Sequence, residues 1–167
     1  MGIEYMKVLW APWRMEYVRG LKGKDCIFCL GLSGGDELTL HKGSLCMVMM
    51  NRYPYCNGHL LVAPRRHVGT LSDLTRDEMA DMMETITRSV EILKQVMKPD
   101  GFNLGLNLGE VAGAGIAQHL HFHVVPRWQG DANFMTVVGD VRVISEDLSA
   151  TYGRLRPFFD ALVAHET

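Results

Sequence analysis

Residues 119–125 read His119-Leu120-His121-Phe122-His123-Val124-Val125, with imidazole and apolar side chains in strict alternation. In a β-strand alternate side chains share one face, so the pattern predicts a strand that directs three imidazoles to one side and apolar groups into a core. Neighbouring imidazoles on that face would stand roughly 7 Å apart. A neutral imidazole can act near pH 7 as a nucleophile, a proton donor or a metal ligand, because its unperturbed pKa is about 6.5. A single histidine in a strand is usually structural, whereas three in alternation indicate a functional strand.

Outside this stretch, the chain carries the patterns of four further strands. Strand character is found in Leu38 to His41, Leu45 to Met50, His59 to Ala63 and Phe102 to Leu108, in addition to His119 to Val125. Turn-forming residues between the second and third strands favour a hairpin.

Two helices are expected between and after the strands. Apolar residues recur at three- and four-residue steps from about Arg76 to Lys98. Thr75 and Glu78 form a capping-box pattern at the start of this long helix. A weaker helical pattern covers about Glu146 to Ala164. Strands followed by a helix and more strands predict an α+β domain with an antiparallel five-stranded sheet.

Composition narrows the class of protein. The chain has 167 residues, enough for one domain with a packed core. Hydrophobic residues make up 47% and charged residues 22%, which excludes a disordered or fibrous protein. The net charge of −2 argues against binding to duplex nucleic acid. The longest uncharged run, Val111 to Pro126, contains three histidines, and the N-terminus lacks an uninterrupted apolar signal, so we expect a cytoplasmic protein without a membrane span.

A glycine-rich loop, Gly109 to Gly115, lies directly before the histidines. Small residues let backbone N–H groups approach an anion closely, although glycines also make plain turns. Next to an imidazole nucleophile, such a loop favours a phosphoryl-transfer site, because a nucleophile and a phosphate cradle are complementary parts of one site.

The cysteines Cys26 and Cys29 have a Cys-x-x-Cys spacing. In a reducing compartment this spacing indicates metal binding or redox chemistry, and two buried thiols are a third possibility. Cys46 and Cys56 have no such spacing and are expected to be inert.

Together these motifs resemble the histidine-triad (HIT) family, whose pattern is His-φ-His-φ-His-φ-φ with φ apolar. The resemblance covers roughly residues 8–140 and includes Asn57 to Pro64 and Val124 to Trp128. Similarity to the bacterial dinucleoside tetraphosphate phosphorylase (ATP adenylyltransferase-like) branch is found in Val8 to Met15, Asn103 to Gly109 and Gly130 to Phe134. The resemblance implies a single HIT domain over residues 1–167, with a core over about 8–140, a helical extension over 141–167, and a homodimer.

The resemblance also implies catalysis through a covalent nucleotidyl-histidine. His121 would attack the α-phosphorus of an adenosine (di)nucleotide derivative, and water or inorganic phosphate would then accept the nucleotidyl group. His123 would donate hydrogen bonds to the phosphate. The same phosphate oxygens would be bound by Asn107, Gly113, Ala114 and Gly115. The phosphorylase branch resembles Gly-Gly-Ser in this loop, so Gly115 lacks a hydroxyl that would hold the incoming phosphate.

For the nucleoside, the resemblance places a ribose ligand at Asn51, at the end of the second strand. Ile27, Phe28 and Met49 match apolar positions that cover the base, and Trp128 would contact phosphate or an interface. Ordinary core packing is the competing interpretation for the three apolar residues, and Asn51 also fits a turn before Tyr53 and Pro54.

The Cys-x-x-Cys pair needs two more ligands to complete a tetrahedral site. Many bacterial HIT proteins supply a histidine after the third strand and the first histidine of the triad, which are His67 and His119 here. Zinc bound by Cys26, Cys29, His67 and His119 would be closed and therefore structural.

Two other functions remain open from the sequence. The three histidines of the triad would also fit a catalytic zinc in a hydrolase, although no carboxylate ligand lies near them in the sequence. A nucleotide-binding regulator with little turnover would have the same pocket.

Overall fold

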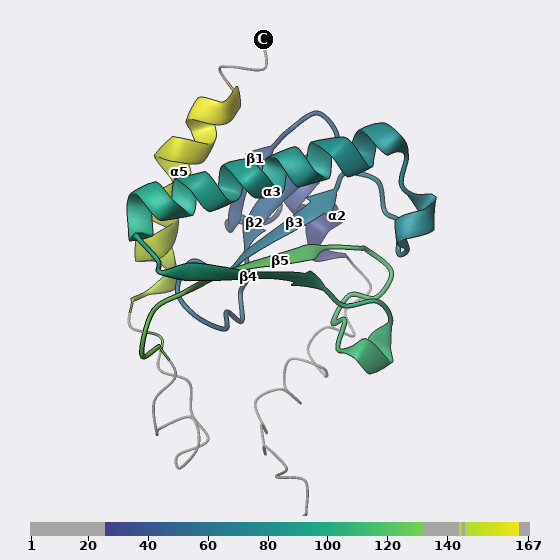
Figure 1. Cartoon of the computed structure of the whole chain (residues 1–167). Helices are drawn as coiled ribbons and strands as arrows, with labels where there is room; N and C mark the ends of the chain where they lie inside the picture. The colour runs from purple at the N-terminus through teal and green to yellow at the C-terminus, as the bar shows by residue number, and fades with distance from the viewer. Residues whose placement is uncertain (1–25, 132–143, 145, 164–167) are drawn as a thin grey trace, which may run out of the picture.

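Five antiparallel strands form one sheet in the order β1-β2-β3-β5-β4 (Figure 1). The computed structural model describes residues 26–131, 144 and 146–163. The strands are β1 (Thr39–Lys42), β2 (Cys46–Met50), β3 (Leu60–Pro64), β4 (Gly101–Leu106) and β5 (Phe122–Arg127). The predicted α+β class and antiparallel five-stranded sheet are confirmed, and β2 and β3 form the expected hairpin.

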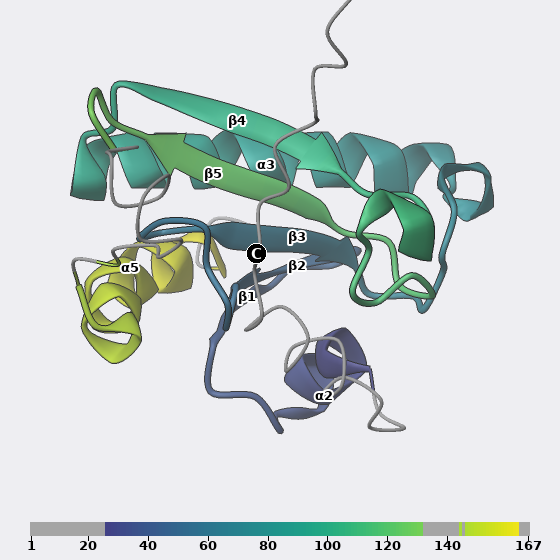
Figure 2. The ribbon, with the colours of Figure 1, turned by 90° about the horizontal axis from the view of Figure 1, so that it is seen from below.

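Within the described residues, three α-helices accompany the sheet. They are α2 (Ile27–Ser33), α3 (Arg76–Met97) and α5 (Leu148–Val163), and two short 3-10 helices are η1 (Leu71–Asp73) and η2 (Glu110–Ala112). The long helix and the C-terminal helix agree with the prediction, whereas α2 was not predicted. Figures 1 and 2 show α3 running along one side of the sheet and α2 lying apart from α3. None of the described helices has the length and apolar content needed to cross a membrane.

The start of α3 is fixed by the predicted capping box. The Thr75 hydroxyl accepts a hydrogen bond from the Glu78 N–H, and the Glu78 carboxylate accepts one from the Thr75 N–H. Arg66, from the loop after β3, binds both oxygens of the same carboxylate at 2.6 and 2.7 Å. This guanidinium lowers the pKa of Glu78 to about 2. The helix is therefore tied to the end of β3, where the metal ligand candidate His67 follows.

Alternation along the strands divides the core between the two faces of the sheet. One face carries the main cluster, in which β2 and β3 residues such as Val48 and Val62 pack beneath α3 and α5. The other face carries a smaller cluster, whose buried members are Phe28, Met47, Met49, Leu61 and Ala63. This smaller cluster packs α2 against the sheet, and its Phe28 contacts the rings of His119 and His121.

The histidine stretch is only partly a strand, which corrects the prediction of a strand over His119 to Val125. β5 begins at Phe122, opposite Val62 of β3, so His119 and His121 precede it. The pairing of β3 with β5 ends at Val62 and Phe122, although in the same register Ala63 would meet His121 and Pro64 would meet Leu120. Pro64 has no N–H to donate, and the Leu120 N–H donates instead to the Val68 carbonyl at 2.7 Å.

Some predicted features fall outside the described residues. The similarity at Val8 to Met15 lies there, as do residues 132–134 of the stretch Gly130 to Phe134. Helix α5 falls within residues 141–167, where a helical extension is expected. The domain limits stay predictions.

Candidate functional site

The three histidines lie on the face of the sheet that carries α2. His123 is in β5 and pairs with Leu61 of β3, a member of the smaller core cluster. The residues between the histidines, Leu120 and Phe122, pack into the main cluster on the opposite face. The rings of His121 and His123 have centroids 5.1 Å apart. The structure therefore brings the second and third histidines of the triad together.

The imidazole of His121 is held with one nitrogen ready to react. Its Nδ1 lies 2.8 Å from the main-chain oxygen of His119. A carbonyl oxygen only accepts hydrogen bonds, so Nδ1 carries the proton and Nε2 keeps its lone pair. Burial lowers the pKa of His121, which favours the neutral imidazole. A neutral ring with an unprotonated Nε2 has the state that a nucleophile needs.

A fourth histidine, His59, was not predicted to take part in the site and orients His123. The Tyr55 N–H donates to His59 Nδ1 at 3.0 Å, and the Asn51 side-chain amide lies 3.3 Å from the same nitrogen. His59 Nδ1 is therefore an acceptor, and its Nε2–H donates to His123 Nδ1 at 2.9 Å. The ring of Tyr55 stacks on His59 with centroids 4.7 Å apart.

This chain of hydrogen bonds places the His123 proton on Nε2. Among the described residues, that buried Nε2 has no hydrogen-bond partner. Burial and the neighbouring His121 lower the pKa of His123 to about 4, so the ring is neutral. His123 consequently presents an unused N–H beside the lone pair of His121. A phosphate oxygen is a suitable acceptor for such a donor.

The signal for His59 was present in the sequence. It lies in the stretch Asn57 to Pro64 that carries the family resemblance, directly before β3. What the sequence lacked was the order of the strands: only the pairing of β3 with β5 brings His59 next to His123.

The first histidine of the triad faces a different group of residues. Its Nδ1 lies 3.2 Å from Cys26 Sγ and 3.9 Å from Cys29 Sγ, and His67 Nδ1 lies 3.4 Å from Cys29 Sγ. The four ligand atoms of Cys26, Cys29, His67 and His119 all lie within 4.8 Å of one another. Tetrahedral zinc spaces its Cys and His ligand atoms roughly 3.3–3.8 Å apart. The predicted ligand set therefore fits zinc in composition, and three of its separations, at 3.2, 3.4 and 3.9 Å, lie close to this spacing.

The tautomer of His119 also suits a metal. Its Nε2 lies 2.8 Å from the Pro64 carbonyl, so Nε2 carries the proton and Nδ1 directs its lone pair toward the cysteines. Burial lowers the pKa of His119 to about 4, which keeps the ring neutral. We name these four residues the Cys/His cluster. Because His119 faces the cysteines while His123 faces His59, the triad does not converge on a single ion, and the geometry does not support the zinc-hydrolase alternative.

The glycine-rich loop continues from β4 through η2. Gly113 has φ +91°, a left-handed conformation that favours glycine, and its carbonyl accepts a hydrogen bond from the Asn107 side chain at 3.4 Å. The Gly113 and Ala114 N–H groups already donate to carbonyls within the loop, at 2.9 and 3.3 Å. No such main-chain bond uses the Gly115 N–H in the part of the chain that is described. Of the three amides expected to bind phosphate, that of Gly115 is the one left available.

The residues expected around the nucleoside divide into two groups. Phe28 and Met49 are fully buried in the smaller core cluster, as the core-packing interpretation expects. Ile27 and Asn51 are only partly buried. The Asn51 side chain accepts a hydrogen bond from the Tyr53 N–H at 3.0 Å, so Asn51 both makes the expected turn and contacts His59.

Trp128 follows β5 and is partly buried. Its main-chain N–H donates to the Asp131 carboxylate at 3.2 Å, a hydrogen bond within a turn. A phosphate or interface role for its ring stays a prediction.

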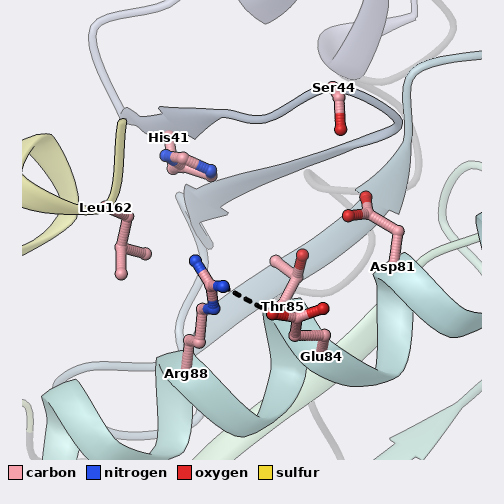
Figure 3. A pocket seen from close by; sticks show the side chains of 7 residues that line it. All are labelled: His41, Ser44, Asp81, Glu84, Thr85, Arg88 and Leu162. Atoms are coloured by element: carbon pink, nitrogen blue, oxygen red, sulfur yellow. Dashed lines mark hydrogen bonds and ion pairs between the residues drawn. The ribbon is translucent and has the colours of Figure 1, made fainter. Parts of the chain in front are cut away.

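A hollow of about 330 Å³ lies on the other side of the sheet (Figure 3). Its lining consists of His41, Ser44, Asp81, Glu84, Thr85, Arg88 and Leu162. His41 pairs with Val48, whose side chain packs beneath α3, so the hollow opens on the face opposite the histidines. None of the predicted site residues lines it, and we assign it no role in the chemistry.

The chain belongs to the HIT family, since the HIT domain family matches residues 36–130. This confirms the resemblance found in the sequence. The AP-4-A phosphorylase of Mycobacterium tuberculosis is 40% identical over 159 residues, which cover 89% of this chain and 82% of that protein. The bis(5'-nucleosyl)-tetraphosphatase [asymmetrical] of Schizosaccharomyces pombe is 31% identical over 93 residues, 56% of this chain and 50% of that protein.

A solved structure supports the same assignment. It is the crystal structure of a Zn-bound histidine triad family protein from Mycobacterium smegmatis, with a TM-score of 0.68 and 26% sequence identity, covering 84% of this chain and 97% of that chain.

Proposed function

We propose that this protein is a nucleotidyl-transferring enzyme that acts on the α-phosphate of adenine dinucleoside polyphosphates through a covalent nucleotidyl-His121. The observation that carries the proposal is the pairing of two neutral imidazoles with opposite roles. His121 offers a lone pair on Nε2, and His123 offers a proton on Nε2. The named relatives that act on AP-4-A and on nucleosyl tetraphosphates support the substrate class.

In the first step, His121 Nε2 forms a bond to the α-phosphorus, and the bond from that phosphorus to the bridging oxygen breaks. The remaining nucleoside polyphosphate leaves with the electron pair of the broken bond. Because a terminal phosphate has a second pKa of about 6, this leaving group departs as an anion without needing a full proton transfer. The adduct leaves a positive charge on the His121 ring, and the His119 carbonyl, which accepts from Nδ1, stabilises this charge.

His123 stabilises the charge on the phosphorus centre. Its Nε2–H donates to an oxygen of the transferring group, and His59 holds the ring in the tautomer that can donate. In the second step, water or inorganic phosphate attacks the phosphorus, the bond to Nε2 breaks, and His121 regains its lone pair. When water is the acceptor, the proton that it loses passes to solvent. Water yields a nucleoside monophosphate, and phosphate yields a nucleoside diphosphate.

We propose that the Cys/His cluster holds a structural zinc. The donor set, its spacing and the fixed tautomer of His119 fit that ion, and a solved relative is described as Zn-bound. A bound zinc would supply a cross-link among four side chains, and with all four positions occupied by protein it would offer no place to a substrate.

The test is turnover of diadenosine tetraphosphate, with and without inorganic phosphate, followed by product analysis. We expect ATP together with AMP from hydrolysis, or with ADP from phosphorolysis. His121→Ala should lower turnover by more than about 10³-fold and retain nucleotide binding, whereas His123→Ala should lose roughly 10- to 100-fold. Denaturing mass spectrometry of a quenched reaction should detect an acid-labile nucleotidyl adduct on His121. Turnover that survives in His121→Ala would overturn the covalent mechanism, and a wild-type protein that binds nucleotide without turnover would favour the regulator.

A further inference from the structure

Phe28 lies between the Cys/His cluster and the nucleophile candidate. Its ring centroid is 4.8 Å from that of His119 and 5.0 Å from that of His121. The side chain is fully buried. In sequence Phe28 lies between the two cysteines of the cluster, as the second residue of α2. One aromatic ring thus contacts both a cluster residue and the imidazole that would attack phosphorus.

A second link runs through the main chain of His119. The side chain of His119 faces Cys26, and its main-chain oxygen accepts the hydrogen bond that fixes His121 Nδ1. Any shift of His119 therefore moves the acceptor that orients His121. The ring and the carbonyl act on the same imidazole from two directions.

Helix α2 has little intrinsic stability of its own. It has 7 residues, which is too short to persist without tertiary contacts. Its N-cap, Cys26, makes no side-chain capping bond, and its first turn has no acidic residue. Helix α2 is held by tertiary contacts: Phe28 is buried in the smaller core cluster, Ile27 and Leu32 pack against that cluster, and the two cysteines contact His119 and His67. Occupying the cluster would fix both ends of the contact between α2 and His119.

We propose that Phe28 is a positioning residue through which metal binding at the Cys/His cluster orders the His121 imidazole, a ring that the metal does not touch. The kinetic part of this inference rests on the proposed function. The structural part does not, because it concerns the orientation of a side chain in the free protein.

The structural part is tested by two-bond ¹H–¹⁵N NMR correlations of the histidine rings, which show which ring nitrogen carries the proton. In the zinc-loaded wild-type protein we expect one sharp pattern for His121, with the proton on Nδ1. After zinc is removed with a chelator, we expect this pattern to broaden or split, while the methyl signals of Leu155 in the core beneath α3 stay unchanged. An unaltered His121 pattern overturns the proposal. Loss of the whole native spectrum also overturns it, because the cluster would then support the entire fold.

The kinetic part compares two buried rings. Phe28→Met removes the ring and keeps an apolar side chain of similar reach, and Phe159→Met makes the same change in the fully buried core between α3 and α5. With zinc content checked, we expect Phe28→Met to lower kcat for diadenosine tetraphosphate by about 10- to 100-fold with KM nearly unchanged. Phe159→Met should leave kcat within about two-fold, since Phe159 lies in the main cluster, on the face of the sheet opposite the histidines.

Equal kcat values for Phe28→Met and wild type overturn the coupling, and so do equal losses in both variants. The NMR comparison uses the wild-type chain, so it decides the inference even where Phe28→Met does not fold. A wild-type protein without turnover would count against the proposed function alone, because the NMR result stands independently.

Discussion

His59 shows how a residue can control chemistry without facing the substrate. It is fully buried, and its two ring nitrogens are both used: Nδ1 accepts from Tyr55 and Nε2 donates to His123. The backbone N–H of Tyr55 therefore decides, through two imidazoles, where the proton of His123 is located. A backbone N–H can only donate, whereas an imidazole or hydroxyl can donate or accept. The contact with Tyr55 therefore fixes the tautomer of His59.

The role of His59 leads to a mutational prediction. His59→Phe keeps a ring of similar size and removes the donor to His123, so His123 is free to take either tautomer. We expect kcat to fall by about ten-fold, the factor associated with roughly 1.4 kcal/mol of lost orientation. Steady-state kinetics with diadenosine tetraphosphate measure the loss.

A matched control is available in His41, a buried histidine outside the proposed site. His41→Phe makes the same change on the opposite face of the sheet, and it should alter stability without altering the catalytic rate. Equal rates for His59→Phe and wild type would show that His123 is oriented by another group.

Gly115 bears on the choice between water and phosphate as acceptor. Of the three loop amides expected to bind phosphate, its N–H is the one that stays available. The resemblance to the phosphorylase branch implies that a serine hydroxyl at this position would hold the incoming phosphate. A neutral hydrogen bond contributes about 1 kcal/mol, equivalent to roughly five-fold in rate. Gly115→Ser should therefore raise the ratio of ADP to AMP several-fold at fixed phosphate. If added phosphate yields no ADP from either protein, the enzyme is a hydrolase, and the similarity to the phosphorylase branch does not extend to the acceptor.

At the scale of elements, α2 depends most on contacts from elsewhere in the chain. We expect the purified protein to contain about one zinc per chain, and we expect Cys29→Ser to lower both the zinc content and Tm. Losing one ligand of a structural site should cost a few kcal/mol, which corresponds to roughly 5–10 °C for a domain of this size. Metal analysis and calorimetry measure the two effects. Ser33→Ala, at the far end of α2, is a control that leaves the cluster intact. Zinc-free protein of unchanged Tm would contradict the assignment.

The elements that the sequence predicted well are those whose limits are set by local patterns within the element. Helix α3 carries its capping box and its apolar stripe within its own sequence, and the structure confirms both. Helix α2 was missed because 7 residues contain about two turns of pattern, and its place is set by distant contacts with His119 and the smaller core cluster. The start of β5 was predicted too early because its pairing with β3 ends at Phe122, and the Leu120 N–H donates to Val68, which lies outside the sheet.

The same distinction applies to the site. The composition of the cluster and the histidine alternation were readable from the chain. Which histidine meets which partner was not, because that depends on the order β3-β5-β4. His119 and His123 look equivalent in the sequence, yet one faces two thiols and the other faces an imidazole.

At the scale of the whole molecule, β4 is an edge strand of the described sheet, and among the described strands it pairs only with β5. Leu104 in β4 and Leu108 just after it are about half exposed, as is Met83 on α3. An open edge beside exposed apolar side chains favours association with a second copy about a two-fold axis. We therefore predict a homodimer, with light scattering at micromolar concentration giving twice the chain mass of 18.8 kDa.

The surface of this homodimer can be tested by charge substitution. Leu104→Lys should shift the mass toward the monomer, because it places a charge at the proposed contact. Leu30→Lys is the matched control, since Leu30 is similarly exposed but lies on α2. A monomeric wild-type protein would contradict the prediction.

The places where β3 and β4 end have a consequence for how the site responds to a ligand. The pairing of β5 with β3 ends at Val62, and its pairing with β4 ends at Leu106, both opposite Phe122, so the two residues before His121 are paired with neither neighbouring strand. The main-chain oxygen of His119 is thereby left to a side chain, His121, and not to another strand. The His119 carbonyl therefore orients the His121 imidazole in the folded protein, before any nucleotide binds. Little rearrangement of the nucleophile remains for the moment of reaction, which is the condition under which a polar site lowers a barrier most effectively.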